Sequence, residues 1–467
     1  MAGRDNPQFE IHNPQSLMII MKFGGTSVAD GAAITRVTEI VRSRRERQPV
    51  VVVSALAGVT DQLLDAAHLA GEGDLRSALA VVHELRERHD AAINQAVCRA
   101  KERSLASEAV STHFAGLSLM LEALALLRED GPKAEDAVAG HGELCSAEIV
   151  ARALEARDLP GVLVDARQVI VTDATFGRAV PDRKLLAERA HAHLASAVRK
   201  GGIPVTQGFV GATVKGIPTT LGRGGSDYTA ALLGAALGAG EVEIWTDVDG
   251  FMTADPRVVP DVRTLPEASY DEAAELAFFG AKVLHPATIV PLVERGIPVW
   301  IKNSLHPEGA GTKIVTRTAP SVGTVKSIAS KRGVTILNLR AARMLGTHGF
   351  LKSMFDAFAR HGTAVDVVTT SEVSVSVSLE NGAPDPALLA ELGSLGDVAM
   401  TRERAIICVV GEGLRDTPGV PARILGALAA LPVEMISLGA SKINLTFVVP
   451  DAHASDAVRK LHEEFFS

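Results

Sequence analysis

Short apolar runs and helical patterns alternate along the longer, N-terminal part of the chain. The apolar runs are typical of buried strands and lie at residues 17–22, 49–54, 162–165, 203–208, 242–245 and 298–301. Between them, residues 30–45 and the Ala/Leu-rich stretch 61–127 have the periodicity of amphipathic helices. Strands that alternate with helices predict an α/β fold, an open and largely parallel sheet between helices.

The C-terminal part contains an internal repeat. Residues 349–362 predict a helix that opens at a glycine, and a strand pair follows at 364–378. A second helix opens at Gly419, and its strand pair lies at 432–448. The two copies are offset by about 68 to 70 residues, which is typical of duplicated units. We therefore expect two small α+β units after the large α/β domain.

Composition and charge narrow the class of protein. The 467 residues exceed one ordinary core, and aromatic residues make up only 4%, so aliphatic side chains must fill the interior. The formal net charge of -8 gives no indication of a nucleic-acid partner. Cys98, Cys145 and Cys408 are widely separated, with no metal-ligand spacing, and fit free thiols in a reducing compartment.

No stretch of the sequence predicts export or membrane insertion. The apolar run at 17–21 is too short for a signal sequence or a membrane span, and we expect no later stretch to approach one. A soluble cytoplasmic protein is therefore expected.

The first candidate site follows the first strand directly. In the stretch Lys22-Phe23-Gly24-Gly25-Thr26-Ser27, the glycines allow backbone N–H groups to approach a phosphate, and Lys22 adds a full positive charge. A strand-to-helix turn that merely needs glycine would look the same, and on its own this motif favours that simpler interpretation.

A second glycine-rich loop opens the helix at 227–238. It reads Thr219-Thr220-Leu221-Gly222-Arg223-Gly224-Gly225-Ser226-Asp227, and Ser226 or Asp227 can cap the helix. Capping alone leaves Arg223, placed between glycines, without a purpose. An anionic partner for Arg223 is the more economical hypothesis.

Two further stretches carry chemistry in the same region. Thr246-Asp247-Val248-Asp249-Gly250 follows a strand and continues through Asp255 to Arg257, which suits a nucleotide site at the carboxyl end of an open sheet. A turn rich in Asp, Gly and Pro is the alternative. Lys282 and Glu143 are single residues whose ordinary explanations are a surface lysine and a carboxylate in a first helical turn.

These pieces fit phosphoryl transfer to a carboxylate. A carboxylate nucleophile is ionised at neutral pH and needs no general base, so the reaction requires positioning and cations that stabilise the developing charge. No Ser/His/Asp or Cys/His nucleophile pattern is present. An amino-acid substrate also needs an anion for its ammonium and a cation for its α-carboxylate, and Glu143 and Arg223 could supply these.

Taken together, the motifs resemble the aspartate kinases of the amino-acid kinase family. The matching stretches are KFGGTSV (22–28), VVVSALAGVTD (51–61), GELCSAE (142–148), GFVGATVKGIPTTLGRGGSDYTAA (208–231), TDVDGFMTADPR (246–257) and SYDEAAELAFFGAKVLHPATIVP (269–291). The C-terminal repeat resembles the paired ACT domains of these enzymes. The resemblance covers the chain from about Met18 to its end.

The resemblance implies roles for individual residues. The implied catalytic residues are Lys22, Arg223 and Asp227, and the implied aspartate-binding residues are Ser54, Thr60, Glu143, Phe209, Arg223, Gly225 and Ser226. The implied ATP-binding residues are Lys22, Phe23, Gly24, Gly25, Thr246, Asp247, Met252, Asp255, Arg257, Lys282 and Val283. Family members often carry Tyr where Met252 stands. Mg²⁺ is implied by ATP, with no ligand signature of its own.

The regulatory half most resembles the lysine-sensitive type. Residues implied to bind the effector are Met344, Thr347, Phe350, Leu351, Ala364, Val365, Asp366, Ser371 and Glu372. Asp366 and Glu372 would accept hydrogen bonds from the effector's ammonium groups, whereas Gly346 and Thr347 depart from the expected polar pair. These residues could instead simply form the edge of a sheet. The first repeat is expected to bind the effector and the second to support dimerisation.

The expected organisation is a tail (1–16), a catalytic domain (17–314), a linker (315–324) and two ACT domains (325–400 and 401–467) that exchange strands and helices. The expected partners are L-aspartate, ATP and a feedback amino acid, with lysine favoured, in a homodimer or dimer of dimers. The alternatives are another amino-acid kinase and an inactive amino-acid sensor. A fusion with homoserine dehydrogenase would need several hundred more residues and a dinucleotide fingerprint.

Overall fold

The computed structural model describes residues 17–467 except 281–282, 319–324, 345–347, 380–383 and 440. The chain forms two compact units. The first comprises residues up to 250 together with 266–270 and 283–317, and the second comprises 251–265, 271–282 and 318–467. The expected tail 1–16 lies outside the described residues, as does most of the expected linker 315–324.

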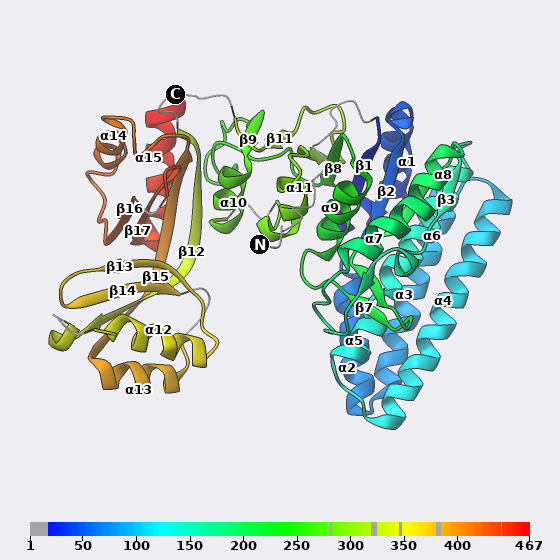
Figure 1. Ribbon diagram of the computed structural model, residues 1–467, viewed down its shortest axis with the longest axis horizontal. Helices are drawn as coiled ribbons and strands as arrows, with labels where there is room; N and C mark the ends of the chain where they lie inside the picture. Colours follow the sequence, from blue (N-terminus) through cyan, green and yellow to red (C-terminus); the bar gives the residue numbers. More distant parts are fainter. Residues whose placement is uncertain (1–16, 281–282, 319–324, 345–347, 380–383, 440) are drawn as a thin grey trace, which may run out of the picture. The chain divides into compact units, whose positions relative to one another are not determined.

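An eight-stranded sheet organises the first unit (Figure 1). Its strands, in spatial order, are β3 (Gly161–Leu163), β5 (Ile203–Gln207), β2 (Pro49–Val53), β1 (Ile19–Phe23), β8 (Glu241–Thr246), β10 (Val299–Asn303), β11 (Thr312–Val315) and β9 (Glu267–Ser269). All neighbouring pairs are parallel except β10 and β11. The expected open and largely parallel sheet is therefore confirmed, and the predicted strands appear with small shifts of their ends.

The register of the central strands sets the position of the candidate site. β1 pairs with β2 and with β8, so that Phe23 lies opposite Val53 on one side and Trp245 on the other. All five residues of β1 are buried, as a central strand covered on both faces requires. The three carboxyl ends consequently meet at one edge of the sheet, where the glycine loop and residues 54–60 begin.

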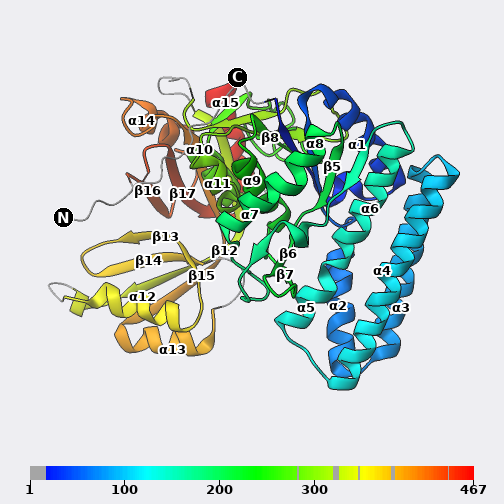
Figure 2. The same cartoon turned by 45° about the vertical axis from the view of Figure 1, so that its right-hand side comes forward.

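Helices cover the sheet of the first unit. They are α1 (Gly31–Ser43), α2 (Val59–Glu72), α3 (Leu75–Ala96), α4 (Ala100–Leu127), α5 (Pro132–Ala139), α6 (His141–Glu155), α7 (Arg183–Ala190), α8 (Ser196–Arg199), α9 (Gly225–Leu237) and α11 (Val290–Val293). A π-helical turn, His191–Ala195, joins α7 to α8. Figures 1 and 2 show the long helices α3 and α4 side by side. The helical stretch expected at 61–127 is therefore α2, α3 and α4.

Helix α4 corrects one expectation from the sequence. Among the described residues, it is the one helix that is long and apolar enough to cross a membrane by length and composition. No such stretch was expected. Its buried face, which includes Val110, Phe114 and Leu117, belongs to the hydrophobic core of the first unit. One face of α4 thus packs on this core, while only 28% of its most apolar window is buried within the described structure.

A small sheet that the sequence did not predict supports the second glycine loop. It contains β4 (Val171–Thr172), β6 (Val210–Thr213) and β7 (Pro218–Thr220), with β6 and β7 antiparallel. The hairpin places Val210 opposite Thr220, so residues 208–209 and 221–226 leave it side by side. The glycine loop then enters α9, which confirms the predicted helix.

The second unit contains a six-stranded sheet (Figure 2). Its order is β13 (Val365–Thr370), β14 (Ser374–Leu379), β12 (Val325–Arg340), β15 (Asp397–Gly411), β17 (Asn444–Pro450) and β16 (Met435–Leu438). Its helices are α10 (Tyr270–Phe278, starting in the first unit), α12 (Phe350–Arg360), α13 (Pro386–Leu395), α14 (Val420–Ala427) and α15 (Ala454–Phe466). The repeated helix and strand pair are therefore confirmed as α12-β13-β14 and α14-β16-β17.

Two long strands, β12 and β15, run through both halves of this sheet. The C-terminal part of β12 contributes Leu337 and Leu339 to a core with α12 and α13, while its N-terminal part contributes Val325 and Ile328 to a core with α14 and α15. The expected boundary between residues 400 and 401 falls inside β15. That boundary, like the other expected domain limits, stays a prediction.

Candidate active site

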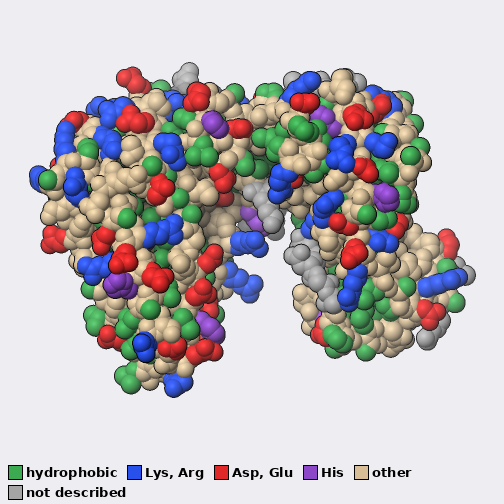
Figure 3. Space-filling model, turned by 180° about the vertical axis from the view of Figure 1, so that it is seen from behind, with side chains coloured by type: hydrophobic (Ala, Val, Ile, Leu, Met, Phe, Trp, Pro, Cys, Tyr) green, Lys and Arg blue, Asp and Glu red, His purple; other side chains and the backbone are tan. Residues whose placement is uncertain are grey.

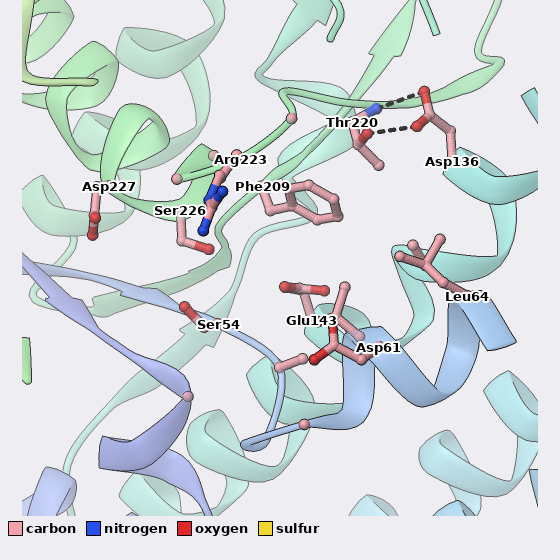
Figure 4. Close-up of a pocket in the computed structure, with 18 of the residues that line it drawn as sticks. Ser54, Asp61, Leu64, Asp136, Glu143, Phe209, Thr220, Arg223, Ser226 and Asp227 are labelled. Atoms are coloured by element: carbon pink, nitrogen blue, oxygen red, sulfur yellow. Dashed lines mark hydrogen bonds between the residues drawn. The ribbon is translucent and has the colours of Figure 1, made fainter. Parts of the chain in front are cut away.

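One cavity of about 600 Å³ lies in the first unit, at the carboxyl edge of the sheet (Figure 4). Its walls come from the ends of β1 and β2, the start of α2, helices α5 and α6, and the loop that opens α9. It brings together ten of the residues predicted from the sequence: Lys22, Gly25, Ser54, Thr60, Glu143, Phe209, Arg223, Gly225, Ser226 and Asp227. These include every predicted catalytic and aspartate-binding residue.

Lys22 and Asp227 form an ion pair at this edge. Lys22 Nζ lies 2.6 Å from Asp227 Oδ1, and both side chains are largely buried. Lys22 is the fourth residue of β1, while Asp227 lies in the first turn of α9, where a carboxylate is stabilised by the helix dipole. The pair holds an ammonium group beside the glycines where a phosphate would lie.

Glu143 is a buried carboxylate in the first turn of α6. Burial raises its pKa to about 8, although a backbone N–H of Ala55 and the charge of Lys22 act in the opposite direction. Its Oε2 has no hydrogen-bond partner among the described residues. A buried carboxylate that keeps a free acceptor atom is ready to receive a cationic donor such as an ammonium group.

Arg223 is exposed at the rim of the cavity and has no ion-pair or hydrogen-bond partner among the described residues of its unit. Gly222 and Gly224 on either side have φ of 76° and 72°, the left-handed region that glycine tolerates best. In Figure 4 the side chains of Arg223, Ser226, Phe209 and Glu143 point toward a common space. A cation and an anion therefore face one small cavity from separate elements.

Phe209 has a strained backbone for a residue with a side chain, with φ of 68°. Its N–H donates to Thr229 Oγ1 at 3.0 Å, and its carbonyl accepts from Leu221 N–H at 2.9 Å. The ring packs closely on Gly225, where an added Cβ would lie 2.7 Å from it. At Gly208, a Cβ would lie 2.6 Å from Ser226 Oγ. Gly208 was not among the predicted residues, although its need to be small follows from this contact.

A second group of polar residues lies at the ends of β1, β8 and β10. Gly24 N–H donates to Trp245 O at 3.0 Å, and Thr246 Oγ1 donates to Asp247 Oδ1 at 3.1 Å. Sequence reasoning missed Ser304 and Asn303, which follow the strand predicted at 298–301. Ser304 Oγ lies 2.8 Å from Ser27 Oγ, and Asn303 Nδ2 donates to Asp249 at 2.8 Å. Their position at a strand's carboxyl end was the available signal.

Several predicted ATP-binding residues lie elsewhere. Phe23 is fully buried and stacks on Trp245, with 6.0 Å between ring centroids, so its ring contributes to the core. Met252, Asp255 and Arg257 belong to the second unit, where Asp255 and Arg257 bind each other at 2.7 Å. Val283 is half-buried in the first unit, and Lys282 lies outside the described residues.

The predicted effector residues are spread along the first repeat. Phe350 and Leu351 begin α12, Met344 ends the 3₁₀ turn Ala342–Met344, and Ala364 precedes β13. Val365 and Asp366 lie at the start of β13, whereas Ser371 and Glu372 lie in the turn after its other end. Thr347 lies outside the described residues. Asp366 is paired with Lys331 of β12, which sequence reasoning did not single out.

Comparison with known proteins defines the class. The model of the amino acid kinase family matches residues 18–303, and that of an ACT domain matches residues 407–465. The first match contains every strand of the eight-stranded sheet except β11, together with the whole cavity, and the second lies within the second repeat. The fold and site are thus those of an amino acid kinase catalytic region followed by an ACT region.

Relatives narrow the class further. Lysine-sensitive aspartokinase 3 of Escherichia coli (strain K12) is 39% identical over 459 residues, which cover 97% of this chain and 100% of that protein. The chloroplastic aspartokinase 3 of Arabidopsis thaliana is 35% identical over 97% of this chain and 82% of its own length. The crystal structure of E. coli aspartokinase III in complex with lysine and aspartate has a TM-score of 0.83, 38% identity and coverage of 97% and 100%. The chain therefore belongs to the amino acid kinase family and, within it, to the aspartokinases.

Proposed function

We propose that this protein transfers the γ-phosphoryl group of ATP to the β-carboxylate of L-aspartate, giving 4-phospho-L-aspartate and ADP. The observation that carries the proposal is the cavity in which the buried, partly unpartnered Glu143 faces the free Arg223 beside the Lys22–Asp227 pair. A related E. coli aspartokinase III structure contains aspartate and ADP, with a TM-score of 0.80 and 38% identity.

The substrate amino acid is held by charge complementarity. Glu143 binds the α-ammonium group, and Arg223 binds a carboxylate, with Ser226, Ser54 and Thr60 as further hydrogen-bonding groups. Phe209 and Gly225 form the apolar wall that limits the size of the side chain. Because the substrate ammonium replaces the missing donor of Glu143, binding also stabilises the ionised form of that residue.

Lys22 acts on the transferred group. Its ammonium, held by Asp227, stabilises the negative charge on the phosphoryl oxygens in the transition state, while the N–H group of Gly25 approaches the phosphates. The β-carboxylate attacks as an ionised nucleophile, and the bond from the γ-phosphorus to the bridging oxygen of ADP breaks. Thr246, Asp247 and Val283 of the first unit are proposed to contact the nucleotide, and Phe23 to support it from the core. The nucleotide contacts that the resemblance implies for Met252, Asp255, Arg257 and Lys282 stay predictions from the sequence.

The residues present fit a Mg²⁺ ion that enters with the nucleotide. No group of three or more His, Cys, Asp or Glu side chains arranged for a metal occurs in the described part of the chain. Mg²⁺ commonly keeps several waters and binds phosphates with one or two carboxylates, so a dedicated protein cage is not needed. When bound, the ion would neutralise phosphate charge, and it would be held by Asp227, which pairs with Lys22, and by Asp247, which follows β8.

Feedback inhibition is proposed to act through the second unit, with lysine as the effector. The related E. coli structure binds lysine. In this chain the proposed contacts are those of the first repeat, with Asp366 and Glu372 receiving ammonium groups. Coupling between effector and catalytic sites typically amounts to about 1–3 kcal/mol.

We further propose a cytoplasmic homodimer or dimer of dimers formed through the ACT region. Its outer strands β13 and β16 carry the exposed side chains of Val368, Ile436 and Leu438, which suit burial against another copy. On the face shown in Figure 3, basic and acidic side chains are interspersed. The absence of a nucleic-acid or membrane partner stays a prediction.

Trapping of the acyl phosphate with hydroxylamine tests the proposal. The protein, ATP and L-aspartate should give aspartyl hydroxamate, and added lysine should suppress it. Suppression by threonine, or only by both amino acids, would retain the enzyme and replace the effector. Product from glutamate or another acid, with none from aspartate, would identify a different amino-acid kinase. No product from any acid would favour an inactive sensor.

A further inference from the structure

A buried carboxylate that no sequence motif singled out connects the walls of the cavity. Asp136, in α5, is only 3% exposed. Its Oδ2 accepts from Thr220 N–H at 3.0 Å and from Gly177 N–H at 2.9 Å, and its Oδ1 accepts from Thr220 Oγ1 at 2.5 Å. Figure 4 shows both bonds to Thr220. Both oxygens are therefore engaged by protein groups, and the three donors come from Thr220 and Gly177.

The two residues that Asp136 holds lead directly to Arg223. Thr220 is the last residue of β7, and its carbonyl accepts from Ala179 N–H at 2.8 Å. The next residue, Leu221, donates to the carbonyl of the strained Phe209. Gly177 approaches the loop from the other side, because a Cβ on Gly222 would lie 2.9 Å from the Gly177 carbonyl. Asp136 thus fixes both supports of the Gly222-Arg223-Gly224 turn.

The hydrogen bonds of Asp136 restrain a turn that has little to orient Arg223 by itself. Arg223 lies between two glycines and has no partner of its own among the described residues, so nothing in the turn itself orients the guanidinium. Buried hydrogen bonds to a carboxylate are stronger than those between neutral groups, and their loss leaves buried donors unsatisfied. A displacement of about 1 Å in such a turn can cost about a hundredfold in activity.

We propose that Asp136 is a positioning residue for aspartate binding, acting on Arg223 and Phe209 through Thr220 and Gly177. The proposal rests on the proposed function, in which Arg223 binds a carboxylate of aspartate. Asp136 itself does not contact the substrate. Its role depends on the positions at which its two oxygens accept hydrogen bonds, and its negative charge is secondary.

The variant Asp136→Asn separates the effect of the hydrogen-bond positions from the effect of the negative charge. In Asp136→Asn, the amide oxygen can accept from both backbone N–H groups, and the NH₂ group can donate to Thr220 Oγ1, because a hydroxyl can accept as well as donate. In Asp136→Ala, all three bonds are lost. Thr220→Val removes the hydroxyl alone and keeps the backbone bond, which provides a milder variant where Asp136→Ala reduces the yield of folded protein.

The chain offers a matched control in the same region. Asp173 also accepts from two backbone N–H groups and one threonine hydroxyl, those of Thr175 and Val180, at 2.8 to 3.1 Å. It is exposed and makes no bond to β7. Asp173→Ala therefore removes the same kinds of bond from residues 175 and 180, and leaves all three bonds of Asp136 to Thr220 and Gly177 in place.

Steady-state kinetics of the full-length protein test the proposal, with wild-type turnover of L-aspartate measured first. Asp136→Ala should raise KM for aspartate about tenfold or more and change KM for ATP less than twofold. Thr220→Val should show a smaller rise of the same kind, and Asp136→Asn should recover most of the loss. Asp173→Ala should stay within about twofold of wild type. In the double variant with Arg223→Ala, Asp136→Ala should add little, because both act on one interaction.

The outcomes separate this proposal from the proposed function. A wild-type protein without aspartate turnover refutes the proposed function. Turnover with an unchanged KM in Asp136→Ala and Thr220→Val refutes only the role of Asp136. The role is also overturned if Asp136→Asn is as impaired as Asp136→Ala, if Asp173→Ala is equally impaired, or if the effects of Asp136→Ala and Arg223→Ala multiply fully.

Discussion

Lys22 and Asp227 join the end of β1 to the first turn of α9 through contact between Nζ and Oδ1 at 2.6 Å. We expect Lys22→Met to lower kcat about 100- to 1000-fold, because the cation that stabilises the transferred phosphoryl group is removed. It should also lower the free energy of unfolding, by up to about 3 kcal/mol, since Asp227 then lacks its counter-ion in a largely buried position. Kinetics and urea denaturation measure the two effects.

The double variant Lys22→Met/Asp227→Asn separates stability from catalysis. Neutralising both partners should restore much of the lost stability, because no unpaired buried charge remains. Activity should stay low. Wild-type kcat in Lys22→Met would show that the ammonium has no part in phosphoryl transfer.

Glu143 makes stability depend on pH in a predictable direction. Its pKa is about 8 in the folded protein, against 4.5 for the ordinary carboxyl. Between these values the folded state holds a proton that the unfolded state has released, so the free energy of unfolding falls as pH rises from about 4.5 to 8. Glu143→Gln should remove this part of the slope. Denaturation at several pH values measures it.

Two comparisons make the Glu143 prediction specific. Glu39→Gln, an exposed change on α1, should leave the slope as in wild type. Added L-aspartate should flatten the slope of the wild-type protein, because the substrate ammonium lowers the pKa of Glu143 on binding. A slope that is the same in wild type and Glu143→Gln would assign the pH dependence to other groups.

His89 makes the opposite contribution on the acid side. Burial lowers its pKa to about 4, while the ordinary value is 6.5. Between pH 6.5 and 4 the unfolded state binds more protons, so stability is lost as pH falls through this range, by an amount on the order of 3 kcal/mol. His89→Leu should reduce that loss. His83→Leu, an exposed change on the same helix α3, should not alter it. Equal acid sensitivity in both variants would contradict the prediction.

Lys331 forms an ion pair with Asp366, a residue proposed to bind the effector. Its Nζ lies 3.1 Å from Asp366 Oδ2 and 4.6 Å from the ring centroid of Phe278 in α10. We expect Lys331→Met to lower the lysine concentration for half-inhibition severalfold, because the effector no longer displaces an internal ammonium. Inhibition curves with aspartate and ATP held constant measure the shift.

The second repeat provides the control for Lys331. Arg404 of β15 binds Glu434 at 2.6 Å, in the place that corresponds to the pair of Lys331 and Asp366. Arg404→Met should leave half-inhibition unchanged if only the first repeat binds the effector. A shift in both variants, or in Arg404→Met alone, would move the effector site or divide it between the repeats.

Much of the fold follows from local pattern. The apolar run at 17–22 predicted a buried strand, which the structure has at Ile19–Phe23, and the glycines at 24–25 and 222–225 marked the turns where strands pass into helices. The repeat in the second half was visible because each copy opens a helix at glycine and follows it with two alternating strands. The long strands β12 and β15 were missed, since their patterns change where each strand passes from one core to the other.

By itself, the sequence determined the class of fold and the glycine loops and charged residues that are candidates for binding. The fold class follows from hydrophobic periodicity, and the candidates follow from the conformational freedom of glycine and the charge of lysine and arginine. Only the tertiary structure decided which of them meet. Lys22 and Asp227 are far apart in the chain and pair only because α9 begins at the sheet edge where β1 ends. Asp136 has no motif, and its importance arises from three donors on two separate segments, at Thr220 and Gly177, that folding brings to one carboxylate. The environment that raises the pKa of Glu143 is likewise a property of packing, because burial is set by neighbours that local sequence does not specify.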